Sequence, residues 1–141
     1  MAAGLTLVAE RLDAFRASFE RAVLELADPG AFAQSLQTDG PLAGEPLDLA
    51  LIAAIDDAVW GQGFAAPLFC DEVEVVRQRL LKERHLKVEL RLAGRPYSAI
   101  AFGRTEPLLP RTRIAYRIAR NDWGGRSEVQ LLIEAALGTS L

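Results

Sequence analysis

The sequence predicts an α+β protein in which an N-terminal helical lead-in precedes a small five-stranded β-barrel. Apolar residues recur at three- and four-residue steps from Leu12 to Leu26, which is typical of an amphipathic helix. Apolar and charged residues instead alternate strictly from Leu86 to Leu92, which is typical of a half-buried strand. Further short apolar runs separated by Gly-containing turns fill the second half of the chain, and this pattern favours a small barrel.

The first element expected is an amphipathic helix near the N-terminus. Mostly charged residues lie between its apolar positions, which are Leu12, Phe15, Phe19, Ala22, Val23 and Leu26. The segment Asp28-Pro29-Gly30 ends the pattern, because proline and glycine do not continue a helix. We expect Phe15 and Phe19, four residues apart on one face, to pack against a neighbouring element.

A loop and a short second helix are expected next. Residues 38–46 are rich in Gly and Pro, which predicts a loop. Residues 47–58 predict a helix with an apolar stripe made of Leu47, Leu51, Ile52 and Ile55. Gly61 and Gly63 follow this helix, and because no strand precedes them they do not indicate a nucleotide-binding loop. We place the boundary between the helical lead-in, residues 1–58, and the barrel, residues 59–141, at this point.

The strands of the barrel are expected to form hairpins. Ala93-Gly94 and the stretch from Asn121 to Gly125 supply the turn residues that hairpins need. The strands are expected near Glu72–Leu81, Leu86–Leu92, Tyr97–Phe102, Thr112–Arg120 and Glu128–Ala135.

Charge is distributed unevenly along the chain. The 141 residues, half of them apolar, suffice to bury a core, and the net charge is only −3. Residues 1–70 nevertheless hold three Lys/Arg and ten Asp/Glu, whereas residues 77–126 hold thirteen Lys/Arg and four Asp/Glu. This imbalance indicates either a polyanionic partner for the second half or a solvated strand surface whose cations protect its edges from aggregation.

Several kinds of site and location are excluded or disfavoured by composition. No run of eighteen apolar residues and no leader-like N-terminus occur, so we expect a cytoplasmic protein without a membrane partner. The lone Cys70 and the lone His85 can form neither an internal disulfide nor a Cys/His zinc site. Asp56 and Asp57 are adjacent on a predicted helix, where neighbours point about 100° apart, so a shared metal is not expected.

Several short motifs follow one another in a characteristic order. They are Trp60–Phe69, then His85-Leu86-Lys87, then Ala99–Gly103, and finally a Y-x-x-x-x-N-x-W-x-G pattern formed by Tyr116, Asn121, Trp123 and Gly125. In this order they resemble the C-terminal region of the RecJ family of single-stranded-DNA-specific exonucleases. Residues 1–6 look like the end of that family's DHH-associated domain. One departure is that Ala65 and Ala66 stand where the family pattern has Pro and Glu.

The resemblance implies a division of labour. Residues 1–58 would be a helical remnant of the DHH-associated domain and a linker, and residues 59–141 an OB-like barrel that binds single-stranded nucleic acid. The catalytic DHH domains of such a 5′–3′ exonuclease of DNA repair and recombination, with their Mn or Mg ions, would lie outside this chain. We therefore expect no cofactor and no nuclease activity here. The implied partners are single-stranded DNA, the missing DHH domains and, as a further candidate, a single-strand-binding protein.

The resemblance also indicates where to look for a binding surface. An OB barrel binds single strands through one face and its bordering loops, with cations for the phosphates and aromatic rings for the bases. The basic candidates are Arg79, Lys82, Arg84, His85, Lys87 and Arg91. The candidates for stacking are Trp60, Tyr116 and Trp123, although the pattern around Tyr116 and Phe102 fits a core position equally well.

Two alternative functions stay open at this stage. The barrel could be a protein-interaction module, or a structural clasp of the nuclease with little direct DNA contact. DNA binding with strong salt dependence would favour the barrel as a single-stranded-DNA-binding domain, and protein binding through an apolar groove with little salt dependence would favour the interaction module.

Overall fold

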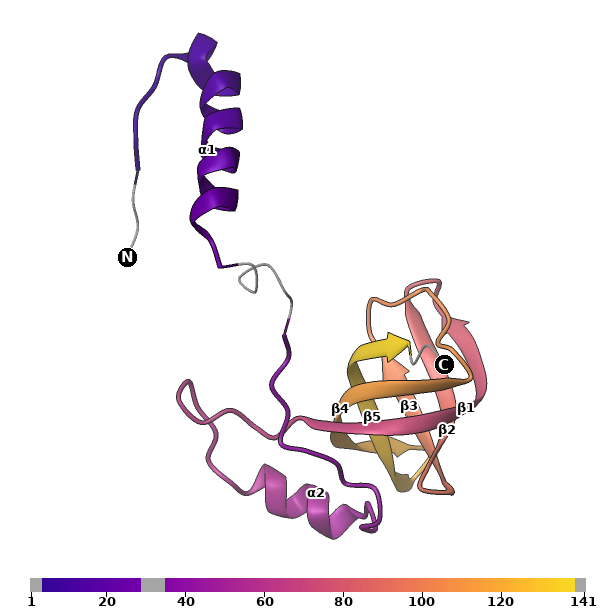
Figure 1. Ribbon diagram of the computed structural model, residues 1–141. Coiled ribbons are helices and arrows are strands. Elements are labelled where there is room, and N and C mark those ends of the chain that lie inside the picture. Colours follow the sequence, from indigo (N-terminus) through magenta and orange to yellow (C-terminus); the bar gives the residue numbers. More distant parts are fainter. Residues whose placement is uncertain (1–3, 29–34, 139–141) are drawn as a thin grey trace. The chain divides into compact units, whose positions relative to one another are not determined.

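The chain folds into two compact units that divide between Leu36 and Gln37. The computed structural model describes residues 4–28 and 35–138, with the backbone but not the side chain of Trp123 (Figure 1). This division lies well before residue 58, where the sequence placed it. The difference has a physical reason, because Leu47 and Ile52 of the predicted second helix are buried in the same core as the barrel strands.

In its described residues, the first unit holds one 3-10 turn and one α-helix that follow each other along the chain. A 3-10 turn, Ala9–Arg11, leads into α1, Leu12–Leu26, which confirms the predicted amphipathic helix. Phe15 and Phe19 stack on each other with their ring centroids 5.7 Å apart. None of the residues of α1 is buried. The apolar stripe that the sequence predicts is therefore present but not covered within this unit.

The second helix, α2, spans Leu49–Asp56 and is shorter than expected. The Asp48 carboxylate caps its first turn by accepting a hydrogen bond from the Leu51 N–H, 2.8 Å away. Near its other end the Trp60 indole N–H donates to the Ile55 carbonyl at 2.8 Å. Ile52 faces the barrel and is buried. The helix is thus a fixed part of the second unit.

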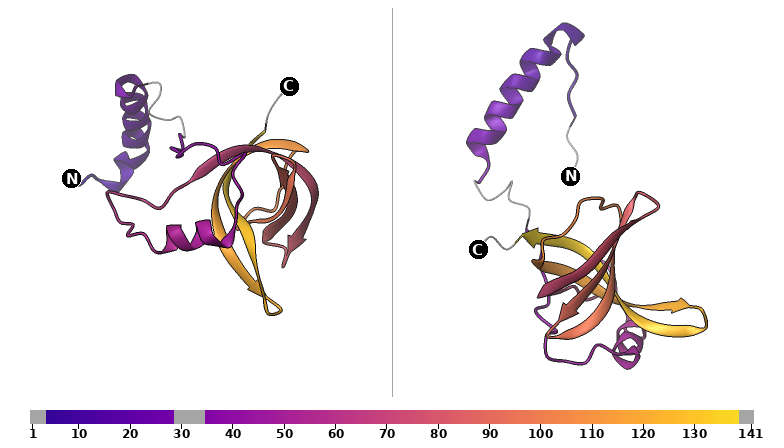
Figure 2. Two further views of the ribbon diagram at one scale, coloured as in Figure 1. Left: turned by 90° about the horizontal axis from the view of Figure 1, so that it is seen from below. Right: turned by 90° about the vertical axis from the view of Figure 1, so that its right-hand side faces the viewer.

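Five strands close into a barrel in the order β1-β2-β3-β5-β4 (Figures 1 and 2). All neighbours are antiparallel except β3 and β5, which pair in parallel. Figure 2 shows the β4–β5 hairpin extending beyond the rest of the barrel. The bounds of the strands are β1 Phe69–Leu81, β2 His85–Leu92, β3 Arg95–Ala101, β4 Arg111–Trp123 and β5 Arg126–Gly138. The predicted five-stranded barrel is confirmed.

Alternation along β2 decides which side chains line the core. Leu86, Val88, Leu90 and Leu92 are buried, so the residues between them, from His85 to Arg91, lie on the outer side of the barrel. In β4 and β5, Ile114, Tyr116 and Leu131 are fully buried. The outer side of β2 and β3 is therefore free to form a binding surface.

A connecting segment, residues 37–68, is fastened to the start of β1. The Asp39 N–H donates to the Leu68 carbonyl at 2.7 Å, and the Leu68 N–H donates to the Asp39 carboxylate at 2.8 Å. The Cys70 N–H donates to the Gly40 carbonyl at 3.0 Å. These hydrogen bonds hold residues 39–40 beside residues 68–70, where β1 begins.

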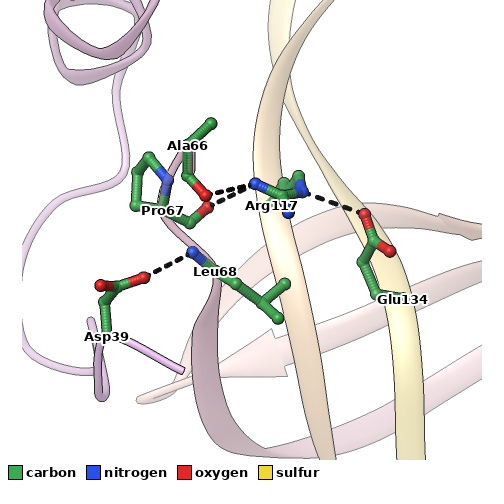
Figure 3. A network of polar contacts seen from close by, with 6 residues as sticks. All are labelled: Asp39, Ala66, Pro67, Leu68, Arg117 and Glu134. Atoms are coloured by element: carbon green, nitrogen blue, oxygen red, sulfur yellow. Dashed lines mark hydrogen bonds and ion pairs between the residues drawn. The ribbon is translucent and has the colours of Figure 1, made fainter. Parts of the chain in front are cut away.

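Arg117 of β4 holds the end of the same segment (Figure 3). Its Nη1 donates to the carbonyls of Ala66 and Pro67 at 2.6 and 3.1 Å, and its Nε donates to Glu134 of β5 at 3.0 Å. One arginine thus joins the connecting segment, β4 and β5.

Asp71 is the buried polar centre of this side of the barrel. The residue is only 4% exposed, and its carboxylate accepts hydrogen bonds from the N–H groups of Leu42 and Ala43 and from the Tyr116 hydroxyl, at 2.9, 3.1 and 2.8 Å. Burial, and then the hydrogen bond to Asp71, raise the pKa of Tyr116 well above its usual range. Tyr116 is therefore held neutral and acts as a donor inside the core.

In the described part of the chain, no helix is both long and apolar enough to cross a membrane.

Candidate nucleic-acid interface

The outer side of β2 and β3 carries a groove of about 870 Å³. The β1–β2 hairpin contributes to one side of it and the β4–β5 hairpin to another. The residues that line it are Arg79, Leu81, Lys82, Lys87, Ser98, Ile100, Asn121, Gly124, Arg126, Glu128 and Gln130. All five strands or their turns take part, so the groove exists only in the closed barrel.

Strand register places the groove residues in rows. Arg79 of β1 lies opposite Lys87 of β2, and Lys87 lies opposite Ile100 of β3. Side chains of directly opposed residues share one face of a sheet, so these three form one row across the groove. Ser98 lies opposite Gln130 of β5, which carries the surface on to the β4–β5 hairpin.

The groove is electropositive because no acidic side chain of the described residues forms an ion pair with its cations. Four cations line it, Arg79, Lys82, Lys87 and Arg126, against the single carboxylate of Glu128. Among residues 4–28 and 35–138, none of these four takes part in an ion pair. Cations that lie together without acidic partners attract polyanions such as a nucleic-acid backbone.

The turn between β1 and β2 carries backbone strain. Lys82 and Glu83 have φ angles of 50° and 55°. The left-handed region costs an L-residue roughly 1–2 kcal/mol, and hairpins usually place Asn or Gly there. The β4–β5 turn uses Gly124-Gly125 for the same purpose. The strained turn places Lys82 in the wall of the groove.

The structure brings together some of the predicted basic residues and separates others. Arg79, Lys82 and Lys87 line the groove, and His85 lies directly opposite the groove residue Leu81. Arg84 is exposed next to the β1–β2 turn but does not line the groove. Arg91 borders a separate, smaller pocket whose charged lining residues are Glu72, Glu74, Arg91 and Arg111. This second pocket is mixed in charge and does not resemble an anion site.

Of the predicted aromatic residues, Tyr116 and Trp60 do not line the groove. Tyr116 is fully buried and bonded to Asp71, so the expectation that it stacks on bases is wrong. Trp60 stacks on Phe64 with ring centroids 5.3 Å apart and borders an apolar pocket next to α2. The side chain of Trp123 lies outside the described residues. Trp60 is therefore positioned to close the α2 side of the unit rather than to enter the groove.

Several groove residues were not among the binding candidates named from the sequence. Ser98, Asn121, Arg126 and Gln130 reach the groove from β3, β4 and β5. The parallel pairing of β3 with β5 joins segments about thirty residues apart, and no local pattern indicates it. Asn121 and Arg126 do flank the Gly124-Gly125 turn, and this position in a barrel loop was the available signal.

The described residues offer no cluster of three or more His, Cys, Asp or Glu side chains that could hold a metal ion. The groove offers four cations, the Glu128 carboxylate, two amides, a hydroxyl and aliphatic surface.

Comparison with known families agrees with this arrangement. Residues 38–135 match the model of the RecJ OB domain family. This chain belongs to the RecJ OB domain family. The matched region begins next to the boundary that separates the two compact units, so the second unit as a whole corresponds to the RecJ OB domain.

The curated relatives of this chain are much longer proteins. The chain is 39% identical over 142 residues to the single-stranded-DNA-specific exonuclease RecJ of Dickeya dadantii. It is 33% identical over 142 residues to the protein of the same name from Escherichia coli. Both alignments cover 95% of this chain and 25% of the relative. The chain thus spans about a quarter of the length of the curated relatives it matches.

Solved structures support the same fold. RecJ from Thermus thermophilus in complex with Mn²⁺ superimposes with a TM-score of 0.71 at 21% identity, over 98% of this chain and 21% of that chain. The complex of that protein with Mg²⁺ gives a TM-score of 0.69 at 20% identity, over 96% of this chain and 21% of that chain. At this identity the likeness concerns the fold alone.

Proposed function

We propose that this RecJ OB domain binds single-stranded DNA in the groove on β2 and β3, as the DNA-holding part of a RecJ-like 5′–3′ exonuclease. One observation carries the proposal. The groove lies where OB folds bind oligonucleotides, on the face of the second and third strands between the β1–β2 and β4–β5 loops, and its cations have no acidic partner among the described residues.

The side chains suit a flexible polyanion. Arg79, Lys82, Lys87 and Arg126 would contact phosphates, and the amides of Asn121 and Gln130 would supply hydrogen bonds to sugars or bases. Arg84 and His85, beside the β1–β2 turn, would extend this basic surface. The proposal leaves Arg91 without a phosphate contact in the groove, because it borders the other pocket.

We further propose that the chain itself is not catalytic. Cleavage of a phosphodiester by two metal ions needs clustered carboxylate or histidine ligands. In this proposal the Mn or Mg ions belong to the DHH catalytic domains of the parent enzyme, with which this chain acts in the cytoplasm during DNA repair and recombination. Incubation with single-stranded DNA and Mn²⁺ or Mg²⁺ should leave the DNA intact. Degradation by a preparation free of other nucleases would contradict this part.

A fluorescence anisotropy titration tests DNA binding. A labelled single-stranded oligonucleotide should bind more tightly than a duplex of the same length, and its affinity should fall steeply between 50 and 200 mM salt, a range in which phosphate contacts weaken strongly. Lys87→Gln should weaken binding to all sequences and lower the salt slope by about one. Absence of binding at low salt would overturn the proposal.

One feature favours a second candidate, a protein-interaction module. An apolar pocket of about 160 Å³ lies between α2 and the barrel, lined mainly by Ile55, Trp60, Pro67, Phe69, Ile118 and Leu132. An apolar side chain of a partner such as a single-strand-binding protein would fit this chemistry. Binding of that protein with little salt dependence, together with no DNA binding, would favour this candidate.

A further inference from the structure

The described side chains that line the groove offer no ring on which a base can stack. None of its described lining side chains is aromatic, and its apolar surface comes from Leu81 and Ile100. Single-strand-binding proteins usually combine a basic groove with aromatic rings, because every base has a face that stacks. An exposed ring next to the groove is therefore of interest.

Phe102 provides such a ring. It directly follows β3, and the residue is 64% exposed. Leu86 lies opposite Ala101, so the next position of each strand brings His85 beside Phe102, and their ring centroids are 5.2 Å apart. Leu81, which lines the groove, lies opposite His85. Leu81, His85 and Phe102 thus form a row across the outer side of three adjacent segments.

This row continues the floor of the groove. His85 precedes Lys87 by two residues on β2, so both side chains lie on the same side of the strand, roughly 6.6 Å apart along it. The row of Arg79, Lys87 and Ile100 is therefore the immediate neighbour of the row that ends at Phe102. A strand whose phosphates contact Arg79 and Lys87 would bring a neighbouring base to the Phe102 ring.

His85 holds this ring in place. Its Nδ1 accepts a hydrogen bond from the Gly103 N–H at 3.0 Å, and the two rings meet edge to face at 76°. Gly103 has a φ of 70°, which favours glycine at the residue that carries this N–H. Because Nδ1 is the acceptor, the neutral imidazole carries its proton on Nε2. His85 is therefore a positioning residue that fixes the backbone next to Phe102.

We infer that Phe102, positioned by His85, is a stacking site for one unpaired nucleobase at the β1–β2 end of the groove. The inference rests on the proposed function and adds a contact to the base, whereas the cations contact the backbone. Stacking is tolerant of sequence, so the site would favour unpaired over paired strands without selecting a base.

A pair of oligomers separates base contacts from phosphate contacts. One is a labelled oligothymidylate, and the other is an abasic oligomer of equal length with the same phosphates and no bases. The full chain should bind the first about tenfold more tightly. Phe102→Leu should lose most of this preference by weakening only the binding of oligothymidylate, with an unchanged salt slope. Lys87→Gln, the control, should lower the affinity for both oligomers by the same factor.

His85 variants test the positioning role. His85→Leu removes the acceptor for the Gly103 N–H and should reduce the preference for oligothymidylate several-fold. His85→Asn supplies a side-chain oxygen that can accept the same hydrogen bond, and it should restore part of the preference. Thermal melting of each variant shows that the barrel is folded.

The outcomes distinguish the two proposals. Wild-type protein that binds neither oligomer would overturn the proposed function. The stacking site alone would be overturned if the wild-type protein binds oligothymidylate but Phe102→Leu has the same affinity as the wild type for both oligomers. It would also be overturned if Phe102→Leu loses affinity for both oligomers by the same factor.

Discussion

Two sides of the barrel use the same kind of residue in opposite ways. Beside the connecting segment, Arg117 donates to two backbone carbonyls and to Glu134. In the groove, Arg79 also projects from a strand, but it is exposed and has no ion-pair partner among the described residues. A count of positive charges treats the two residues alike. In the proposed function, the cation that has no acceptor among the described residues is the one available to a ligand.

The largest effect on stability should come from the side of the barrel beside the connecting segment, residues 37–68, which we call the covered side. Asp71→Ala removes the acceptor of two backbone N–H groups and the Tyr116 hydroxyl, and leaves all three without a partner. We expect a loss of about 4 kcal/mol in the free energy of unfolding, because an unsatisfied buried group such as the Tyr116 hydroxyl costs about 1–3 kcal/mol and the two part-buried N–H groups add smaller amounts. Urea unfolding measures it. Asp39→Ala removes an exposed carboxylate that accepts one backbone hydrogen bond, from the Leu68 N–H. It should lower the free energy of unfolding by about 1 kcal/mol. Equal losses would contradict this ranking.

The buried Tyr116 should make the free energy of unfolding depend on pH in the alkaline range. Its raised pKa means that the folded state keeps the phenol protonated, whereas an unfolded tyrosine ionises near pH 10. Its contribution to stability is therefore fully present below about pH 10 and is lost as the pH rises further. Tyr116→Phe should lower stability by about 2 kcal/mol at pH 7 and flatten this alkaline decline. Parallel curves of unfolding free energy against pH for the two proteins would refute the assignment.

A matched pair of substitutions tests the comparison directly. Arg117→Met should lower the free energy of unfolding by about 2 kcal/mol, since charged hydrogen bonds are lost, and leave DNA affinity within about twofold. Arg79→Met should change stability by no more than about 0.5 kcal/mol, because the side chain is exposed. It should weaken DNA binding several-fold and lower the salt slope by about one. The contrast between the two arginines fails if both variants change the same property.

The smallest effect concerns the strained turn at the groove. Glu83→Gly removes a left-handed L-residue, so we expect a gain of about 1 kcal/mol and a melting temperature higher by about 4 °C. DNA affinity should stay the same or rise slightly, because one acid is lost beside Lys82. Gly125→Ala, at the corresponding turn position in the β4–β5 hairpin with a φ of 78°, should have the opposite effect on stability. A lower melting temperature for Glu83→Gly would contradict this account.

The elements of the fold were predictable because their signals are local. Alternation from Leu86 to Leu92 places β2 to within a residue of its observed bounds, and the spacing of apolar residues places α1. The ends of β4 and β5 were not predicted, since Asn121 and Asp122 have turn-like side chains. Their pairing with Glu128 and Ser127 nevertheless continues the hairpin to a two-residue turn. Long-range pairing here overrides local preference.

The candidate site was less predictable because it depends on contacts between distant residues. Arg79, Lys82 and Lys87 lie near one another in sequence and were found. Tyr116 was misjudged because its hydroxyl bonds to Asp71, a residue 45 positions earlier in the chain. Gln130 joins the groove only through its pairing with Ser98 of β3. The sequence therefore indicated the part of the groove formed by the β1–β2 hairpin. It did not indicate the part that β5 adds when the barrel closes.

The short ladder between β3 and β5 has a consequence for how the barrel folds and opens. Residues 98–100 pair with residues 130–132, and these three pairs form one of the two seams that join the β1–β3 meander to the β4–β5 hairpin. Both substructures form from neighbouring segments, whereas the seam closes a long loop and should form late. The groove crosses this seam, with Ser98 and Ile100 on one bank and Gln130 on the other. An occupant of the groove would brace the seam and slow the opening of the barrel.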